Sequence, residues 1–410
     1  MNWLTADAHG RWLESETIRL LDFGVAARDP RGGFGWLDAT GALDSSKDTA
    51  LWITCRMTHV YALATLMGRP NAGALVDHGV DALVGRLHDD VHGGWYASVG
   101  PSGPADTAKE AYGHAFVILA ASSAAAAGRP GARELLAEAL ATHSERFWDD
   151  QEGMSRESFS ADWAHGEDYR GINANMHTVE AYLAAADVTN DQVYLQRALR
   201  ICARAVNVYA RAHDWRLPEH FDAEWNPDLD YHHDTPAHPF RPYGATIGHW
   251  FEWARLTVQL ASSLQQAGLA SPDWMVPAAG SLYDAGVREG WNVDGAAGFV
   301  YTVDWDGTPV VRERMHWVAA EAIAAAAVLW RKTGAERYAE QYQRWWEYAG
   351  ECLLDSAGGS WWHELAPDNT VATTVWNGKA DIYHAVQATL IPRLPVSPSL
   401  SASLAAANLD

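Results

Sequence analysis

The chain alternates long segments in which apolar residues recur at helical spacing with short segments rich in glycine and aromatic residues. Apolar positions at i, i+3, i+4 and i+7, together with a helix-favouring composition, predict helices in the long segments. Consecutive helices form hairpins, and the last pairs most simply with the first. The expected helices are 3–21, 49–67, 74–87, 108–127, 132–147, 173–186, 194–212, 245–267, 276–289, 313–333, 335–354 and 376–391.

The short segments between hairpins repeat at a spacing of about 60 residues, stretched once to about 80. Each copy is long enough for a short strand, and four of them carry an aspartate a few residues upstream. The copies begin at Gly32, Gly93, Gly153, Trp215, Gly298 and Gly358, and the upstream aspartates are Asp29, Asp90, Asp150 and Asp355.

One helical hairpin cannot bury its apolar face alone, so neighbouring hairpins must stack. Six hairpins close most economically into an all-α (α/α)6 barrel, with alternate helices lining a cavity and the Gly-aromatic loops shaping its mouth. An open solenoid would need polar caps at both ends, which the sequence lacks. We therefore predict a single catalytic domain over residues 1–391, followed by a loose C-terminal tail at 392–410 that is rich in Pro, Ser and Ala.

Charge and composition narrow the classes of partner. With 30 Lys+Arg against 52 Asp+Glu the net charge is −22, which disfavours nucleic acid and anionic membranes as partners. No apolar run reaches the roughly 20 residues needed to span a bilayer, and no signal peptide precedes the first helix. The three cysteines indicate buried thiols in a reducing compartment, so we expect a cytoplasmic protein. The 21 tryptophans suit a large aromatic core and sugar-binding faces equally well.

Ionisable residues inside otherwise apolar helices are the candidates for chemistry. His177 with Glu180, and His249 with Glu252, have the i, i+3 spacing that places a carboxylate beside an imidazole. Such a carboxylate fixes the tautomer and raises the basicity of a general base. With His384, they favour a group that removes a proton alpha to a carbonyl. Each histidine taken singly, however, is better explained as a satisfied core residue than as a catalyst.

Further candidate site residues stand elsewhere in the sequence. Trp317 and Glu321 have i, i+4 spacing on another predicted inner helix, and Arg56 and Arg241 are suited to hold polar substrate oxygens. The histidine-rich loop at 231–238 has metal-capable residue types, but its spacing matches no recurring tetrahedral site, which favours a structural loop. No phosphate-binding loop, dinucleotide fingerprint or Gly-x-Ser-x-Gly elbow is present.

Together, and in this order, a set of short motifs resembles the N-acylglucosamine 2-epimerase superfamily over nearly the whole chain, and within it the bacterial aldose–ketose isomerase branch. The motifs are Arg11-Trp-Leu-Glu14, Phe34-Gly-Trp36, Leu51-Trp-Ile-Thr54 with Arg56-Met57, Gly93-Gly-Trp-Tyr96, Asn173-Ala-Asn-Met-His177, Glu219-His-Phe-Asp222, Gly248-His-Trp250, Tyr301-Thr-Val-Asp-Trp305 and Asp381-Ile-Tyr-His384.

The resemblance implies an (α/α)6 barrel whose cavity is lined by His177, His249 and His384. It implies catalysis without metal or cofactor on a small monosaccharide, in which an aldose such as mannose becomes a ketose such as fructose through a cis-enediolate. Since family members differ in oligomeric state, it also allows a homo-oligomer. The implied substrate-holding residues are Arg56, Tyr112, Asn173, Arg241, Glu252, Trp317, Glu321 and Lys379.

Because C1 and C2 of a cis-enediol share a face, one imidazole can carry the proton between them. We assign this role to His384 and ring opening to His249, braced by Glu252, and the two roles are interchangeable at this stage. His177 is expected to polarise O1 or O2, and Arg56 to stabilise oxyanion charge.

Several alternatives remain at the level of sequence. Sulfoquinovose isomerases resemble this branch but have glutamines where this chain has His363 and Ala380, which favours a neutral sugar. Within the superfamily the alternatives are a cellobiose-type or N-acylglucosamine-type 2-epimerase and a sulfoquinovose isomerase. Outside it, an inverting glycoside hydrolase would use two of Glu252, Glu321 and Asp381, and a sugar- or protein-binding module would need no histidine–glutamate pairs.

Overall fold

The computed structural model describes residues 2–407, and that part of the chain folds mainly into α-helices. Its contacts divide it into two compact units. The first unit comprises residues 2–20, 202–379 and 384–397, and the second comprises residues 21–201, 380–383 and 398–407. Among the helices of the described chain, none combines the length and apolar character needed to cross a bilayer.

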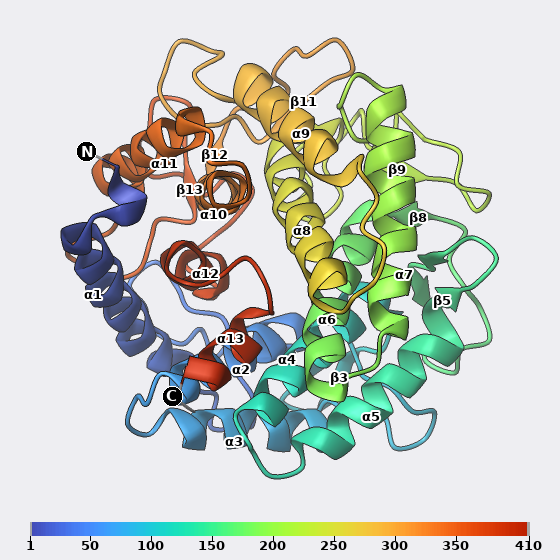
Figure 1. Cartoon of the computed structure of the whole chain (residues 1–410). Helices are drawn as coiled ribbons and strands as arrows, with labels where there is room; N and C mark the ends of the chain where they lie inside the picture. The colour runs from blue at the N-terminus through green and yellow to red at the C-terminus, as the bar shows by residue number, and fades with distance from the viewer. Residues whose placement is uncertain (1, 408–410) are drawn as a thin grey trace. The chain divides into compact units, whose positions relative to one another are not determined.

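Helical hairpins build the second unit. Helix α4 packs on α2, α5 and α6, and α2 packs on α3 (Figure 1). α2, α4 and α6 are buried on nearly all sides, whereas α3 buries one stripe containing Val76 and Val80. The helices are α2 Leu51–Leu66, α3 Ala72–Val84, α4 Ala111–Ala126, α5 Ala132–Thr142, α6 Ile172–Thr189 and α7 Val193–Cys202, which ends at the border of the first unit.

The first unit repeats this arrangement. Helix α8 packs on α9 and α10, and α10 packs on α11 (Figure 1). Helices buried on all sides again alternate with helices buried on one face. α8 and α10 are buried all round, whereas α11 buries only one face, which includes Tyr342 and Trp345. The helices are α1 Asp7–Gly24, whose last turn belongs to the second unit, α8 Ile247–Gln266, α9 Met275–Gly290, α10 His316–Thr333, α11 Glu336–Tyr348 and α12 Tyr383–Leu390.

These helices confirm the predicted pattern, with differences at the ends. Three predicted outer helices close with a π-helical turn, at η3 His143–Phe147, η4 Ala203–Ala210 and η5 Ala349–Leu353. Helix α12 begins at Tyr383 instead of residue 376, because Asp381 Oδ1 accepts the Tyr383 amide at 2.8 Å and starts the helix there. His384 therefore lies in the first turn of α12.

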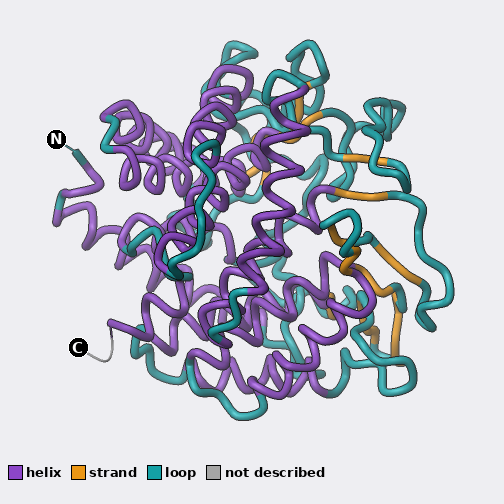
Figure 2. Tube along the Cα trace, turned by 45° about the vertical axis from the view of Figure 1, so that its right-hand side comes forward, coloured by secondary structure: helices purple, strands orange, loops and turns teal. Residues whose placement is uncertain are grey.

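Short strands lie in the connections between the helices (Figure 2). β1, β4, β10 and β12 end directly before α2, α4, α8 and α10, so their antiparallel pairing with β2, β7, β11 and β13 fixes where those buried helices begin. The strands are β1 Thr49–Ala50, β2 Ser98–Gly100, β3 Gly103–Asp106, β4 Lys109–Glu110, β5 Trp148–Asp149, β6 Met154–Ser155, β7 Ser158–Phe159, β8 Arg170–Gly171, β9 His220–Phe221, β10 Ala245–Thr246, β11 Thr302–Val303, β12 Arg314–Met315 and β13 Glu364–Leu365.

All of the Gly-aromatic copies except the one at Trp215 are tight antiparallel turns, and in four of them an aspartate carboxylate accepts backbone amides within the turn. In two of the copies, the aspartate that closes the turn directly precedes the upstream aspartate noted in the sequence, Asp90 or Asp150. Asp89 Oδ1 accepts the amides of Val91 and His92 at 3.0 and 3.1 Å, and Asp149 Oδ1 accepts the equivalent amides in the next copy. An aspartate side chain bonds the backbone amides two and three residues after it, which is the spacing that Asp89 and Asp149 have here.

The segment after residue 391 was expected to be a loose tail. Over its described residues it contains the 3-10 turn η6 Ile391–Arg393 and helix α13 Leu400–Ala407, which packs on α2, α4 and α6 in the second unit. The Ser399 amide donates to Asp187 Oδ2 at 2.7 Å and anchors the start of this helix. Residues 399–407 are thus ordered against the second unit, and residues 408–410 of the predicted tail lie outside the described residues.

Candidate functional site

Most of the predicted site residues lie in the first two turns of buried helices, and each of these helices except α12 begins directly after a short strand. The structure places Arg56 on α2, Tyr112 on α4, Asn173 and His177 on α6, His249 and Glu252 on α8, Trp317 and Glu321 on α10, and His384 on α12. Arg241 and Lys379 lie in loops.

In the first unit, two of the three predicted histidines lie beside one indole ring. The ring of Trp317 lies 5.2 Å from the ring of His249 and 5.7 Å from that of His384, centroid to centroid, with both pairs tilted. Gly248 makes room for this indole, because a Cβ there would lie 2.2 Å from Cζ3 of Trp317. We call Trp317, His249 and His384, with the carboxylates of Glu219 and Glu321, the two-histidine cluster.

Each histidine of this cluster has its own carboxylate partner. His249 Nδ1 lies 2.9 Å from Glu219 Oε2, and His384 Nδ1 lies 2.9 Å from Glu321 Oε1. An ionised carboxylate only accepts, so Nδ1 of both rings carries a proton and Nε2 is the basic nitrogen. All four side chains are buried.

The expected pairing of His249 with Glu252 was wrong. Glu252 Oε1 instead accepts a hydrogen bond from Nη2 of Arg255 at 3.0 Å, while Nε of the same guanidinium donates to Glu321 Oε2 at 2.9 Å. Arg255 therefore bridges two carboxylates, and one of them also holds His384. The spacing of Glu252 along the helix suits His249 and Arg255 equally, and the guanidinium offers the stronger, charge-assisted bond.

In the second unit, Arg56 is the centre of a second group. Its Nη2 donates to the Tyr112 hydroxyl at 2.9 Å and its Nη1 to Asp381 Oδ2 at 3.2 Å. The guanidinium also faces the rings of Phe116 and Tyr383, 4.6 and 4.7 Å from their centroids. Burial opposes its charge, but Tyr112, Asp381 and Tyr383 outweigh this and raise the pKa of Arg56 above its ordinary value. Arg56 is thus a permanent, buried positive charge.

His177 lies beside this group, and its predicted partner is confirmed. Its Nδ1 is 3.3 Å from Glu180 Oε2, and the Tyr383 hydroxyl donates to the same oxygen. The His177 ring meets the Tyr112 ring edge-on at 5.3 Å. Asn173 Oδ1 is buried and, within the described chain, has no hydrogen-bond partner, as is also true of Arg56 Nε. We call Arg56, Tyr112, Asn173, His177 and Tyr383 the arginine cluster.

Arg241 and Lys379 lie elsewhere in the first unit. Arg241 donates from Nη1 to the Tyr231 hydroxyl at 3.3 Å, in the histidine-rich loop. The Lys379 ammonium is fully buried and donates to Asp355 Oδ2 at 2.6 Å and to the Gly359 carbonyl at 2.7 Å. In the second unit, Lys109 makes the same kind of contact with Asp89.

Among the described residues of the first unit, one group has the ligand types and spacing for a metal ion, namely Glu252, Glu321 and His384. The guanidinium of Arg255 already supplies positive charge to both of its carboxylates. In the histidine-rich loop, His238 Nδ1 accepts the backbone amide of Arg241 at 2.9 Å, in keeping with the predicted structural role of that loop.

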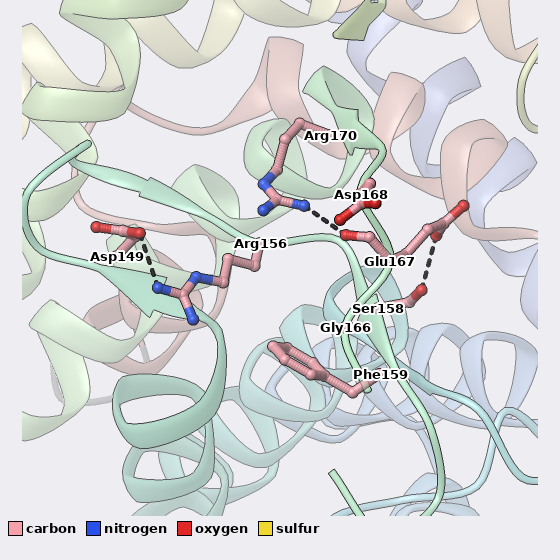
Figure 3. A pocket seen from close by; sticks show the side chains of 8 residues that line it. All are labelled: Asp149, Arg156, Ser158, Phe159, Gly166, Glu167, Asp168 and Arg170. Carbon is pink, nitrogen blue, oxygen red and sulfur yellow. Dashed lines mark hydrogen bonds and ion pairs between the residues drawn. The ribbon is translucent and has the colours of Figure 1, made fainter. Parts of the chain in front are cut away.

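A pocket of about 260 Å³ lies in the second unit, on the loops that precede α6 (Figure 3). Both arginines that line it have hydrogen-bond partners among the lining residues. Arg156 Nη2 donates to Asp149 Oδ2 at 3.0 Å, and Arg170 Nη1 donates to the Glu167 carbonyl at 2.6 Å. None of the predicted site residues lines it.

The sequence analysis gave no role to three residues of these arrangements, namely Glu219, Tyr383 and Arg255. Glu219 stands in a quoted motif but was given no role, because it lies in a loop without helical periodicity. Arg255 is a charged residue in an apolar helix, so the rule that selected Arg56 could have selected it too.

Comparisons with known proteins agree with this geometry. The family model described as N-acylglucosamine 2-epimerase matches residues 32–388. A D-mannose isomerase of Thermobifida fusca is 52% identical over 98% of both chains. Another, from Pseudomonas cannabina pv. alisalensis, is 48% identical over 98% of this chain and 97% of its own. A crystal structure of a D-mannose isomerase superposes with a TM-score of 0.87 at 29% identity, covering 93% of this chain and 97% of its own. The fold class is the (α/α)6 barrel.

Proposed function

The chain belongs to the N-acylglucosamine 2-epimerase family and is an isomerase, and we propose that it interconverts D-mannose and D-fructose without a metal ion. The observation that carries the proposal is the two-histidine cluster. It offers two imidazoles whose Nδ1 atoms are held by carboxylates, so that each ring presents Nε2 as a base. The high identity to D-mannose isomerases over the whole chain supports this choice of sugar.

The reaction needs an acid–base group at three points. Ring opening moves a proton from the O1 hydroxyl to the ring oxygen and gives the open-chain aldose. Nε2 of His384 then takes the C2 proton, and the electron pair forms the C1–C2 double bond as O1 gains negative charge. The same nitrogen returns that proton to C1 while the O2 proton is transferred to O1, leaving the ketone at C2.

We assign ring opening and proton relay to His249. Its bond to Glu219 stabilises the imidazolium that forms in each step. The roles of His249 and His384 are interchangeable within this scheme, because both have the same arrangement of ring and carboxylate. Trp317 supplies an apolar face suited to the C–H bonds of a sugar.

The arginine cluster suits the oxygen atoms of the open-chain sugar. We propose that Arg56 stabilises the negative charge on the enediolate, since it is buried and permanently charged. His177, oriented by Glu180, would polarise O1 or O2. Asn173 and Tyr112 would hold further hydroxyls, and the buried, unpartnered Asn173 Oδ1 supports a ligand there. We retain Arg241, Glu252, Glu321 and Lys379 as candidate substrate-holding residues.

The preference for a neutral sugar rests on two positions. The resemblance implies that sulfosugar isomerases have glutamines at these two positions, where this chain has His363 and Ala380. The His363 ring stacks on His316 at 3.8 Å between centroids, and Ala380 has no polar side-chain group. We therefore propose mannose in preference to sulfoquinovose.

The test is NMR of purified protein with D-mannose in D2O, with EDTA present throughout. We expect fructose to form, with C1 carrying deuterium or the proton transferred from C2. His384→Asn should abolish this, while His233→Asn, which changes a histidine 65% exposed at its side chain, should not. Glucose as the first product would replace the proposal with a 2-epimerase. No conversion of mannose would overturn it and redirect the assay to sulfoquinovose and cellobiose, and release of a reducing end from a disaccharide would indicate a hydrolase.

We also propose that the protein works in the cytoplasm. Cys55, Cys202 and Cys352 are all free thiols in the structure, and burial raises the pKa of Cys202 to about 12, which keeps it protonated and unreactive. Fractionation of the source cells tests this, and recovery outside the cytoplasm would overturn it.

A further inference from the structure

The pocket on the loops before α6 takes no part in the proposed reaction, but its size and lining suit a small ligand (Figure 3). Its volume of about 260 Å³ lies just below the range of roughly 300–1,000 Å³ that is usual for drug-sized ligands, so it suits a single sugar-sized ring. The lining comes from the β5–β6 hairpin, from β7 and from the loop that ends in β8, directly before α6. All of these segments belong to the second unit.

Two guanidinium groups of the lining offer hydrogen-bond donors. Arg156 Nη2 donates to Asp149 Oδ2 at 3.0 Å, so this arginine already has a carboxylate partner. Arg170 Nη1 donates only to backbone, namely to the carbonyls of Glu167 and Tyr169 at 2.6 and 2.9 Å. Within the described chain, Nε and Nη2 of Arg170 make no hydrogen bond or ion pair, so a ligand can use both of them.

Other lining groups offer hydrogen-bond acceptors. The carboxylate of Asp168 is exposed, and among the residues that the structure describes it has no hydrogen-bond or ion-pair partner. Ser158 donates its hydroxyl proton to Glu167 Oε2 at 2.7 Å, which leaves the lone pairs of its oxygen for a further donor. Asp168 and Ser158 can therefore each accept a hydrogen bond from a ligand hydroxyl.

An aromatic ring completes the lining. Phe159 packs against Phe147 and Trp163, whose ring centroids each lie 5.7 Å from its own, and these contacts hold the ring in place. Gly166 lies beside the ring, since a Cβ there would come within 3.1 Å of Phe159 Cε1. The backbone at Gly166 is not left-handed, so its conformation does not require glycine. The missing side chain instead leaves the ring accessible from the pocket.

We infer that this pocket is a second sugar-binding site, which holds a neutral monosaccharide outside the two-histidine and arginine clusters. Hydroxyl groups both donate and accept, so one sugar ring can accept from Arg170 and donate to Asp168 at the same time, with its C–H face on Phe159. A simple anion would meet the carboxylate of Asp168, and a simple cation would meet the guanidinium of Arg170, so the lining disfavours both. Binding here does not depend on the proposed reaction.

The experiment is an NMR titration of the isotope-labelled whole protein with methyl α-D-mannopyranoside. This glycoside cannot open its ring, so the proposed isomerisation cannot consume it. We expect the backbone amide signal of Gly166 and the Nε signal of Arg170 to shift and to saturate at millimolar sugar, which corresponds to weak binding of a small ligand. The Arg170 signal is identified by its loss in Arg170→Gln.

Two variants test the contacts, with the Gly166 amide as the readout. Asp168→Asn removes the charged acceptor without breaking a side-chain hydrogen bond inside the described chain, and we expect the affinity to fall about tenfold or more. Arg170→Gln removes the donors and should weaken binding at least as much. The matched controls are Asp81→Asn on α3 and Arg133→Gln on α5, both at exposed positions of the same unit, and they should bind the glycoside as the wild type does.

A further variant separates this pocket from the proposed reaction site. His384→Asn changes the reaction site and should leave the shift of the Gly166 amide intact. Loss of the shift in that variant would show that it originates at the reaction site, and would overturn the inference.

The inference would also be overturned by the absence of a saturable shift, or by a shift that persists unchanged in Asp168→Asn and Arg170→Gln. A stronger response to sodium sulfate or to glycine than to the glycoside would replace the sugar by an anion or a zwitterion and equally overturn it. If mannose is not isomerised but the glycoside binds as expected, the proposed function fails and the sugar site stands. Isomerisation without binding in the pocket would remove the sugar site alone.

Discussion

His249 Nδ1 and Glu219 Oε2 lie 2.9 Å apart, although the two residues are separated by 30 positions in the chain. Glu219 reaches the imidazole from the loop before β9, and its other oxygen accepts the Thr246 amide at 3.3 Å, just before α8. The carboxylate thus holds both the histidine and the start of the helix that carries it.

Replacement of Glu219 should lower turnover more than sugar binding. In Glu219→Gln the amide no longer stabilises an imidazolium on His249, so we expect kcat to fall about 10- to 100-fold with little change in KM. Steady-state kinetics with mannose measures both. Glu224→Gln removes an exposed carboxylate five residues later and is the control. Equal kinetics in the two variants would contradict a role for Glu219 in orienting the base.

Arg56→Lys tests the proposed oxyanion site. A lysine keeps the charge but cannot bond Tyr112 and Asp381 at once, so we expect a loss of about 1.5–3 kcal/mol in transition-state stabilisation, seen in kcat/KM. Tyr112→Phe, which removes only the hydroxyl, should lose less. A larger loss in Tyr112→Phe than in Arg56→Lys would transfer the main role to the tyrosine.

Lys379 can be tested against a matched residue in the other unit. Lys379 and Lys109 are both fully buried, and each binds the aspartate of a Gly-aromatic turn, Asp355 and Asp89 respectively. Breaking either pair leaves a buried carboxylate unpaired, so Lys379→Met and Lys109→Met should each cost about 3–5 kcal/mol of unfolding free energy. Denaturant unfolding measures this.

The same two variants decide whether Lys379 also contacts the sugar. If Lys379 only stabilises its Gly-aromatic turn, any rise in KM for mannose should be the same in Lys379→Met and Lys109→Met. A rise confined to Lys379→Met would show that it also holds substrate.

Acid should destabilise the second unit through two histidines buried in neutral form. Burial lowers the pKa of His114 and of His143 to about 3 each. Since an unfolded histidine titrates near 6.5, the unfolded state binds more protons below that pH. Stability is complete above about pH 6.5 and is lost progressively as the pH falls toward 3.

Thermal unfolding at a series of pH values measures this loss. His143→Gln keeps a polar group near the Tyr182 hydroxyl but cannot titrate, so its Tm should fall less steeply with pH. His165→Gln, at an exposed position, should follow the wild type. A wild-type Tm that does not change between pH 6.5 and 4 would contradict the prediction.

The helices were predictable because their signal is local. Each buried helix is apolar over several turns and each outer helix has a polar stripe, and these patterns do not depend on which hairpin packs against which. The exception is α12, whose predicted start at 376 ignored Asp381. That aspartate starts the helix seven residues later, and as a single polar residue it stood out little from the surrounding pattern.

The sequence by itself determined the all-α class, the repeat of hairpins, and several of the ionisable residues that are buried in the helices, because these follow from periodicity and composition. The pairing of those residues was decided by tertiary structure. His177 binds the carboxylate one turn away on its own helix. Glu252 has the same spacing from His249 but binds Arg255 instead. His249 binds Glu219, which lies in a loop distant in the sequence. The physical reason is that buried charges take the partners that best satisfy them, and strand pairing and helix packing bring those partners from anywhere in the chain.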